Sequence, residues 1–425
     1  MDKFIVKGGK SLNGTFVPTG NKNEALPVLA ASLLSTGEVC VENVPNILDV
    51  LSMKEIIESF GISITKTSEN GFKFDNSQFI DGQIDQTIFS KIRGSFLMVV
   101  PLLNKLKKIV VPPPGGDKIG RRRLDTHLLA LNQFGVDISV IGNEYHFQLD
   151  KWKAANIFLD EASVMATETA LMAASLIDEE STIYNAACEP HVQGLCRLLQ
   201  GMGVIIEGVG TNFLKITGPK ILSGTTHKIA PDHTEIGSII GLAAVTNSEI
   251  TIEGGGEANM GLIPHFFEKL GVRYEIKKNN IFISAKQELK ILGDTNFSIP
   301  KIDDSPWPGF PADLISIVII IASQCEGTLL VFEKLFESRL FWVDKLISMG
   351  AEIILCDPHR AIVRGPSKLH AQVVNSPDIR AGMALLIASL CAEGTSEIFN
   401  IHQIDRGYQS IDKRLNELGA DIQRV

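Results

Sequence analysis

The sequence predicts an α/β protein of two domains, each with apolar helices inside and sheets outside. A chain of 425 residues is too long for a single core. One short pattern occurs six times: a large apolar residue, glycine, a small or branched apolar residue, any residue and an apolar one. Its glycines lie 74, 68, 68, 79 and 69 residues apart. Units of about 70 residues exceed the usual solenoid repeats, so a grouping of three plus three in two domains fits best.

Each copy of this pattern predicts a helix, a glycine stop and a strand. Amphipathic sequence such as 263–270 precedes the glycine, which is typical of a helix C-terminus. Alternating apolar and polar residues follow, as in 351–355, and predict a strand. The six copies are Phe60–Ile64, Phe134–Ile138, Met202–Ile206, Leu270–Tyr274, Met349–Ile353 and Leu418–Ile422.

A second repeated element lies between these copies and consists of an apolar helix, a polar or glycine turn and a β-branched strand. It occurs at 29–41, 171–183, 241–252 and 386–398. The helices are apolar on nearly all sides, so they must be buried inside a domain. The sheets are then expected on the outside.

Composition excludes several classes of protein. Apolar residues make up 44% and charged residues 21%, as in ordinary globular proteins. The net charge of −9 argues against nucleic-acid binding. The six cysteines are scattered, with no Cys-x-x-Cys, so neither a disulfide framework nor a zinc site is indicated. No segment approaches the roughly 20 apolar residues of a membrane span, and we expect a cytoplasmic protein.

The segment 112–127 is predicted to be a lid over an anion. Three prolines stiffen its approach, and Gly115, Gly116 and Gly120 allow unusual backbone conformations. Asp117 stands at its tip, followed by cations at 118 and 121–123. A solvated surface turn is the alternative interpretation.

Seven motifs carry a resemblance to a known family. They are Gly20–Pro27, Gly115–Gly120, Ala187–Pro190, Phe310–Asp313, Phe336–Arg339, Pro377–Arg380 and Ile404–Tyr408. From residue 1 to 425 the chain resembles the UDP-N-acetylglucosamine 1-carboxyvinyltransferase family of enolpyruvyl transferases. The resemblance implies two inside-out α/β barrel domains, each a threefold repeat of βαβαββ units. It further implies that 22–231 forms one domain with the lid 112–127, that 1–21 joins 232–425 in the other, and that the active site lies in the cleft between them.

The resemblance also implies the chemistry. The family transfers the enolpyruvyl group of phosphoenolpyruvate to the 3′-hydroxyl of UDP-N-acetylglucosamine and releases phosphate, which begins peptidoglycan precursor synthesis. It uses no metal and no organic cofactor, and its partners are these two small molecules. Phosphoenolpyruvate carries about three negative charges, which arginine forks suit well. The oligomeric state stays open.

The residues that match the family's site fall into three groups. The catalytic positions are Lys22, Asp117, Asp313 and Arg406. The positions for phosphoenolpyruvate are Lys22, Asn23, Arg122, Arg339, Arg380 and Arg406. The positions for the UDP-sugar are Asn23, Arg93, Arg122, Arg123, Leu124, Asp125, Thr126, Ser163, Val164, Asp313 and Leu335.

Two carboxylates are assigned the proton transfers. Asp313 is the expected base for the 3′-hydroxyl, with a helix N-cap after Pro311 as the alternative. Asp117 occupies the family's proton-donor position, where most members have cysteine and a minority aspartate. A bound phosphate and the exclusion of water favour the protonated acid. Fosfomycin alkylates the cysteine of the family, so resistance is expected here. His127, which ends the lid, is either near the substrates or packed in a helix.

Four positions depart from the family pattern. Leu48 and Glu161 replace lysines, Met165 replaces a common glycine, and His191 replaces an acidic residue. Three alternatives therefore stay open: a paralogue for another nucleotide sugar, an enolpyruvyl transferase with another acceptor such as shikimate 3-phosphate, and a non-catalytic ligand-binding regulator.

Overall fold

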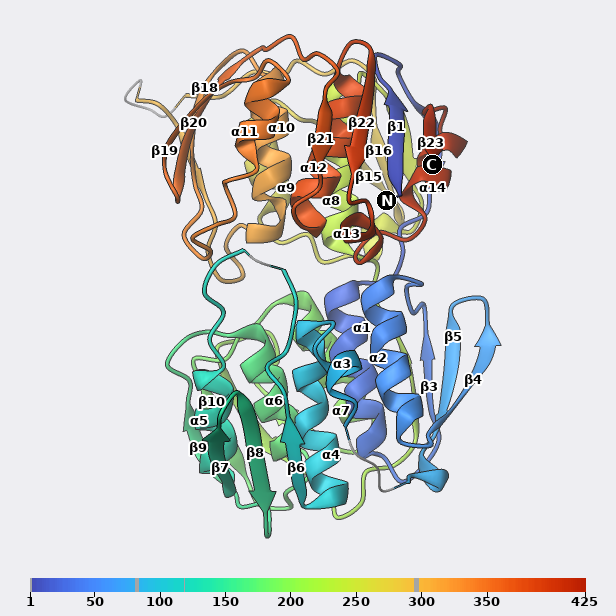
Figure 1. Cartoon of the computed structure of the whole chain (residues 1–425), viewed down its shortest axis with the longest axis vertical. Helices are drawn as coiled ribbons and strands as arrows, with labels where there is room; N and C mark the ends of the chain where they lie inside the picture. Colours follow the sequence, from blue (N-terminus) through green and yellow to red (C-terminus); the bar gives the residue numbers. More distant parts are fainter. Residues whose placement is uncertain (1, 81–83, 118, 294–297) are drawn as a thin grey trace. The chain divides into compact units, whose positions relative to one another are not determined.

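The computed structural model describes residues 2–80, 84–117, 119–293 and 298–425 (Figure 1). By their internal contacts the residues form two compact units. The first unit comprises Met1–Thr19, Lys118–Arg121 and Pro231–Val425, and the second comprises Gly20–Asp117 and Arg122–Ala230. Among the described residues, no helix is long and apolar enough to cross a membrane.

All six predicted glycine stops are confirmed. Each glycine follows a helix and has a positive φ, between +75° and +106°, which L-residues with a side chain adopt only under strain. The helices are α2 (Leu48–Ser59), α5 (Asp125–Gln133), α7 (Pro190–Gly201), α9 (Ile263–Glu268), α11 (Val343–Ser348) and α14 (Ile411–Glu417). The strands that follow are β4 (Ser63–Ser68), β7 (Val136–Ile141), β11 (Ile205–Glu207), β15 (Glu275–Lys277), β19 (Glu352–Asp357) and β23 (Ile422–Arg424).

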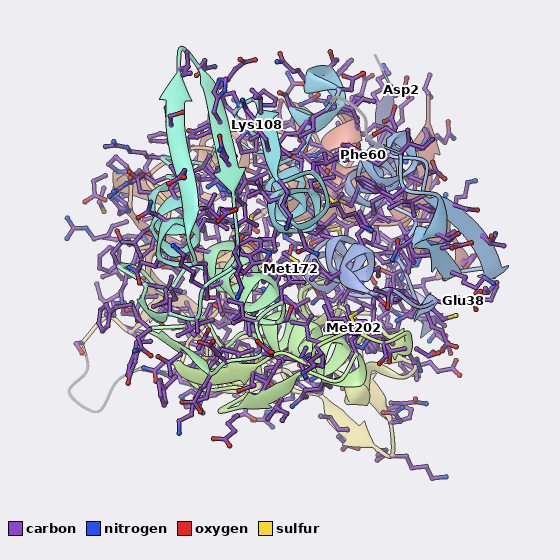
Figure 2. All side chains as sticks on the ribbon, turned by 90° about the horizontal axis from the view of Figure 1, so that it is seen from below. Asp2, Glu38, Phe60, Lys108, Met172 and Met202 are labelled. Atoms are coloured by element: carbon purple, nitrogen blue, oxygen red, sulfur yellow. The ribbon has the colours of Figure 1, made fainter. Side chains whose placement is uncertain are left out.

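The apolar helices are buried, as predicted. In α8 (His233–Val245) every residue is buried, and Met172 of α6 (Val164–Ala174) lies among the helices of the second unit in Figure 2, whereas Glu38 lies at its margin. The other long apolar helices are α1 (Lys22–Ala31), α4 (Val99–Leu106), α10 (Ile315–Gln324) and α12 (Ile379–Cys391). Two short helices complete the set, α3 (Gln86–Phe89) and α13 (His402–Asp405).

The described strands of the second unit form three sheets outside these helices. Their orders are β13-β3-β5-β4, β11-β12-β10-β9 and β6-β8-β7. The pairs β13–β3 and β9–β10 are parallel, and the remaining neighbours are antiparallel. The bounds are β3 (Val39–Glu42), β5 (Gly71–Asp75), β6 (Lys108–Val111), β8 (Glu144–Leu149), β9 (Asn156–Phe158), β10 (Ser181–Tyr184), β12 (Phe213–Thr217) and β13 (Thr225–Lys228).

The first unit repeats this plan with the orders β21-β22-β1-β23, β15-β16-β14-β2 and β17-β18-β20-β19. Here each sheet joins one parallel pair to antiparallel neighbours, whereas the sheet β6-β8-β7 of the second unit is antiparallel throughout. Lys3 of β1 pairs with Phe399 of β22. Among the described strands, no hydrogen-bonded pair joins one of these three sheets to another. The helices are therefore surrounded by three separate sheets and not by a closed barrel. The bounds are β1 (Lys3–Lys7), β2 (Asn13–Phe16), β14 (Glu249–Ile252), β16 (Asn280–Ile283), β17 (Lys301–Asp303), β18 (Gly327–Phe332), β20 (Arg360–Gly365), β21 (Val373–Asn375) and β22 (Thr395–Phe399).

Candidate active site

In the first unit, Asp313 is held by two arginines. Its Oδ1 accepts a hydrogen bond from Arg339 Nη2 at 2.9 Å, and its Oδ2 accepts from Arg380 Nη2 at 2.8 Å and Nε at 3.0 Å. Asp313 lies within the short 3₁₀ helix Ala312–Leu314, whose N-cap is Pro311, so its carboxylate binds cations and does not cap this helix. The structure thus brings three of the predicted residues together.

Both arginines are buried, and Arg380 is held in place by further hydrogen bonds. Arg380 is the second residue of α12, whose N-cap Asp378 accepts from the backbone N–H of Arg380 at 2.8 Å. Its Nη1 donates to the hydroxyl of Tyr408 at 3.2 Å, which in turn lies 3.1 Å from Ser238 Oγ. Burial alone would lower the pKa of Arg380, yet the charge of Asp313 raises it well above its usual value. Arg380 is therefore a permanent cation.

Two acidic side chains lie behind this cluster, and sequence reasoning missed both. Asp304 and Glu333 are fully buried. Asp304 accepts hydrogen bonds from the backbone N–H groups of Lys334 and Leu335, the latter at 3.2 Å. The predicted UDP-sugar residue Leu335 is thereby fixed through its backbone, while its side chain is 44% exposed.

Two further cationic positions belong to the first unit. Arg406 caps the C-terminus of α13, and its Nη1 donates to Gln403 Oε1 at 2.8 Å. In the lid, the backbone N–H of Arg121 donates to Glu337 Oε2 at 3.0 Å, and Ser338 N donates to the carbonyl of Ile119 at 3.1 Å. Position 118 of the lid lies outside the described residues.

In the second unit, Lys22 and Asn23 stand in the first turn of α1. The N-cap Asn21 accepts from the backbone N–H groups of Asn23 at 2.8 Å and Glu24 at 3.1 Å. Lys22 is buried, and its Nζ lies 2.8 Å from Asp49 Oδ2 in α2. This pair holds the ammonium group in one position at the start of the helix.

Glu24, one turn into the same motif, is another residue whose role sequence reasoning did not identify. Its Oε1 lies 2.8 Å from His227 Nε2, and its Oε2 accepts from Ala230 N at 3.4 Å. A Cβ on Gly194 would lie 2.2 Å from Glu24 Cδ, so only glycine leaves room for this carboxylate. Glu235 acts alike in the first unit, where it accepts from Thr19 N at 2.7 Å. Each glutamate fastens the chain where it leaves its unit.

The base of the lid in the second unit is cationic. Arg93 Nη2 donates to the carbonyl of Arg123 at 2.8 Å. Burial, together with the nearby charge of Arg122, lowers the pKa of Arg93 to about 10. Gly116, at φ +107°, lies against both arginines, since a Cβ there would come within 3.0 Å of Arg93 Cβ and 3.4 Å of Arg122 Nη1. The half-buried Asp117 directly follows this glycine.

The C-terminal part of the lid enters α5, and most of its polar groups make contacts inside the protein. Thr126 Oγ1 donates to Asp160 Oδ1 at 2.6 Å, and Leu124 is buried. His127 Nδ1 lies 3.0 Å from Thr169 Oγ1, and its ring packs edge-on against Phe96. Burial and the charge of Arg93 lower the pKa of His127 to about 3. The contacts of the described residues therefore give this histidine a packing role. By contrast, Asp125 is exposed and lies 2.9 Å from Arg123 Nε.

The predicted diphosphate residues Ser163 and Val164 lie at the start of α6. Ser163 is the N-cap and accepts from Ala166 N at 3.4 Å, so the positive end of the helix dipole is presented here. Glu161 is exposed, and its charge acts on Arg93. Among the other departures, Leu48 is exposed at the start of α2, Met165 is half-buried in α6, and His191 is buried in α7.

A family model fits this architecture. Residues 6–415 match the EPSP synthase (3-phosphoshikimate 1-carboxyvinyltransferase) model, and the chain belongs to this family of enolpyruvyl transferases. The fold agrees with two solved structures. The enolpyruvyl transferase NikO from Streptomyces tendae superimposes with a TM-score of 0.88 at 21% identity, covering 100% of this chain and 99% of NikO. EPSP synthase from Acinetobacter baumannii gives a TM-score of 0.77 at 16% identity, with complete coverage of both chains.

Within the family, two relatives by sequence carry the same name. A UDP-N-acetylglucosamine 1-carboxyvinyltransferase from Bradyrhizobium diazoefficiens is 49% identical over 423 residues, which cover 100% of this chain and 98% of that protein. A protein of the same name from Treponema denticola is also 49% identical over 423 residues, with 100% and 99% coverage. The sequence identity to these two relatives is far higher than the identity to the two solved structures. The likeness to the solved structures supports the fold alone.

Proposed function

We propose that this protein transfers the enolpyruvyl group of phosphoenolpyruvate to the 3′-hydroxyl of UDP-N-acetylglucosamine, with release of phosphate. The reaction commits the nucleotide sugar to peptidoglycan precursor synthesis. The observation that carries the proposal is the 49% identity, over essentially the whole of both chains, to relatives named for this activity. The pairing of Asp313 with Arg339 and Arg380 supports it, because it joins a base to two anion-binding forks.

The proposed mechanism uses residues of both units on one pair of substrates. Asp313 accepts the proton of the 3′-hydroxyl as the 3′-oxygen of the sugar attacks carbon 2 of phosphoenolpyruvate. Asp117 donates a proton to carbon 3 and takes one back when the C–O bond to phosphate breaks. The anion is held jointly by Lys22, Arg122, Arg339, Arg380 and Arg406, with Asn23 beside them.

The nucleotide sugar is assigned to the second unit. The N-terminus of α6 at Ser163 and Val164 suits the diphosphate. Arg93 and the segment 122–126 contribute the remaining contacts, together with Asp313 and Leu335 from the first unit. We place the reaction in the cytoplasm, because both substrates are multiply charged and do not cross a membrane unaided.

A second candidate is a paralogue that acts on another nucleotide sugar. Glu161 favours it, since a carboxylate whose charge acts on Arg93 reduces the positive charge available to a diphosphate. A non-catalytic regulator with the same fold is a further alternative. All three predict different results in a single assay.

The decisive measurement is phosphate release from phosphoenolpyruvate across a panel of UDP-sugars and shikimate 3-phosphate, with product masses. We expect turnover with UDP-N-acetylglucosamine and a product heavier by one enolpyruvyl group. Asp313→Asn should abolish it, whereas Asp344→Asn, at an exposed aspartate of the same unit, should not. Turnover with another acceptor alone would support the paralogue or the shikimate enzyme, and none with any acceptor would support the regulator.

A further inference from the structure

Glu333 and Asp304 lie at the same edge of one sheet. Asp304 directly follows β17, and Glu333 directly follows β18. These strands are parallel, with Asp303 opposite Phe332, and Asp304 N donates to the carbonyl of Phe332 at 3.3 Å. The carboxyl ends of parallel strands meet at the same edge, so two acidic side chains are brought together in a fully buried place.

The two carboxyl groups differ in the hydrogen bonds that they accept. Asp304 accepts from two backbone N–H groups, as a carboxylate requires. Neither oxygen of Glu333 accepts a hydrogen bond from a donor among the described residues, and the buried Nε of Arg339 also lacks a partner there. The carboxyl group of Asp304 is within hydrogen-bonding reach of Glu333, but that bond forms only when Glu333 carries a proton. An ionised carboxylate without donors is very costly in such a place, whereas a neutral acid costs far less.

The charged groups that act on Glu333 lie on several elements. Asp304 follows β17, Asp313 lies in the 3₁₀ helix, and Arg339 lies in the loop beyond β18. His359, before β20, meets Glu333 at the main chain, with its Nδ1 2.7 Å from the carbonyl of Glu333. Burial raises the pKa of Glu333 to about 9, against the attraction of Arg339 and with the help of both aspartates.

We propose that Glu333 is a positioning residue: it must stay uncharged so that Arg339 keeps its hydrogen bond to Asp313. When it ionises, Glu333 becomes a second carboxylate that competes with Asp313 for the same guanidinium. Arg339 donates from Nη2 to Asp313, and its Nε has no partner among the described residues, so a turn of the guanidinium toward an ionised Glu333 would break the bond to Asp313. The consequence for turnover rests on the proposed function, whereas the protonation of Glu333 does not.

Infrared spectroscopy tests the protonation directly. The difference spectrum of the parent minus Glu333→Gln at pH 7 should show the carbonyl stretch of a buried carboxylic acid, which disappears as the pH passes about 9. Burial also raises the pKa of Glu168, but that glutamate is present in both proteins, so its band cancels. Glu326→Gln, at an exposed glutamate that ends in solvent 3.0 Å from Lys290, should keep the band. A parent without the band at pH 7 would overturn the proposal, whether or not the protein is a transferase.

The pH dependence of kcat tests the positioning. We expect the parent to lose about tenfold per pH unit above about 9, and Glu333→Gln to lack this limb while its activity at pH 7 stays near that of the parent. A merely structural glutamate would leave the limb unchanged in the glutamine variant, and that result refutes the positioning role. Failure of every acceptor to support turnover would count against the proposed function, and the infrared result would still stand or fall by itself.

Discussion

Glu333→Gln should stabilise the first unit, and more so as the pH rises. The unfolded chain ionises this glutamate near its ordinary value of 4.5, whereas the folded protein holds it neutral up to about 9. The raised pKa therefore costs the folded state about 1.4 kcal/mol for each pH unit between these values, and stability is lost as the pH rises. From pH 5 to pH 8 the parent loses about 4 kcal/mol that the glutamine variant keeps.

Thermal unfolding at pH 5 and pH 8 measures this difference. For a unit of this size about 4 kcal/mol corresponds to a shift in Tm of about 10 °C. Burying the amide has its own cost, but that cost is the same at both pH values and cancels. Glu326→Gln is the matched control, and its gap to the parent should not depend on pH. A gap between Glu333→Gln and the parent that is equal at pH 5 and pH 8 would refute the reasoning.

Three further predictions concern the candidate site and its surroundings. Asp117→Ala should abolish phosphate release while calorimetry still detects UDP-sugar binding, and Asp117→Cys should gain a fosfomycin adduct in intact-mass analysis with UDP-N-acetylglucosamine present; an adduct on the parent, or none on an active cysteine variant, would contradict the assignment. Arg406→Lys keeps the charge but loses the fork, so kcat/KM for phosphoenolpyruvate should fall roughly tenfold or more; unchanged kinetics would remove Arg406 from the site. His127 has its pKa lowered to about 3, so the folded protein should lose about 1.4 kcal/mol per pH unit as the pH falls below about 6.5. His127→Gln should show a shallower loss between pH 7 and pH 5 in denaturant titrations, and an equal slope would contradict this.

Local features of the fold could be predicted from sequence because their signals are local. The six glycine stops require a positive φ at one residue, and the apolar helices show their burial in every turn. The separate sheets, and pairs such as Lys3 with Phe399, depend on contacts between distant segments that no local pattern specifies. The boundaries of the two domains near 22 and 231 stay a prediction that limited proteolysis can test.

The candidate site divides in the same way. Motifs indicated Asp313, Arg339 and Arg380, and the structure brings these three into contact. Glu333 escaped notice because an acidic residue after a strand usually lies in solvent, and only the pairing of β17 with β18 encloses it. Its one sequence signal was its place just before the motif that ends at Arg339.

Because Arg339 and Arg380 are already paired with Asp313, an anion that binds to them in the first unit must displace the carboxylate of Asp313. Two positive charges are already balanced in part by one internal carboxylate, so an incoming anion must offer more than that carboxylate does. Monovalent salts such as chloride offer a single charge without a matching pair of oxygens and should compete poorly. A phosphate or carboxylate that takes over these forks releases the oxygens of Asp313, and a base set free in this way can accept a proton only after its counter-charge has arrived.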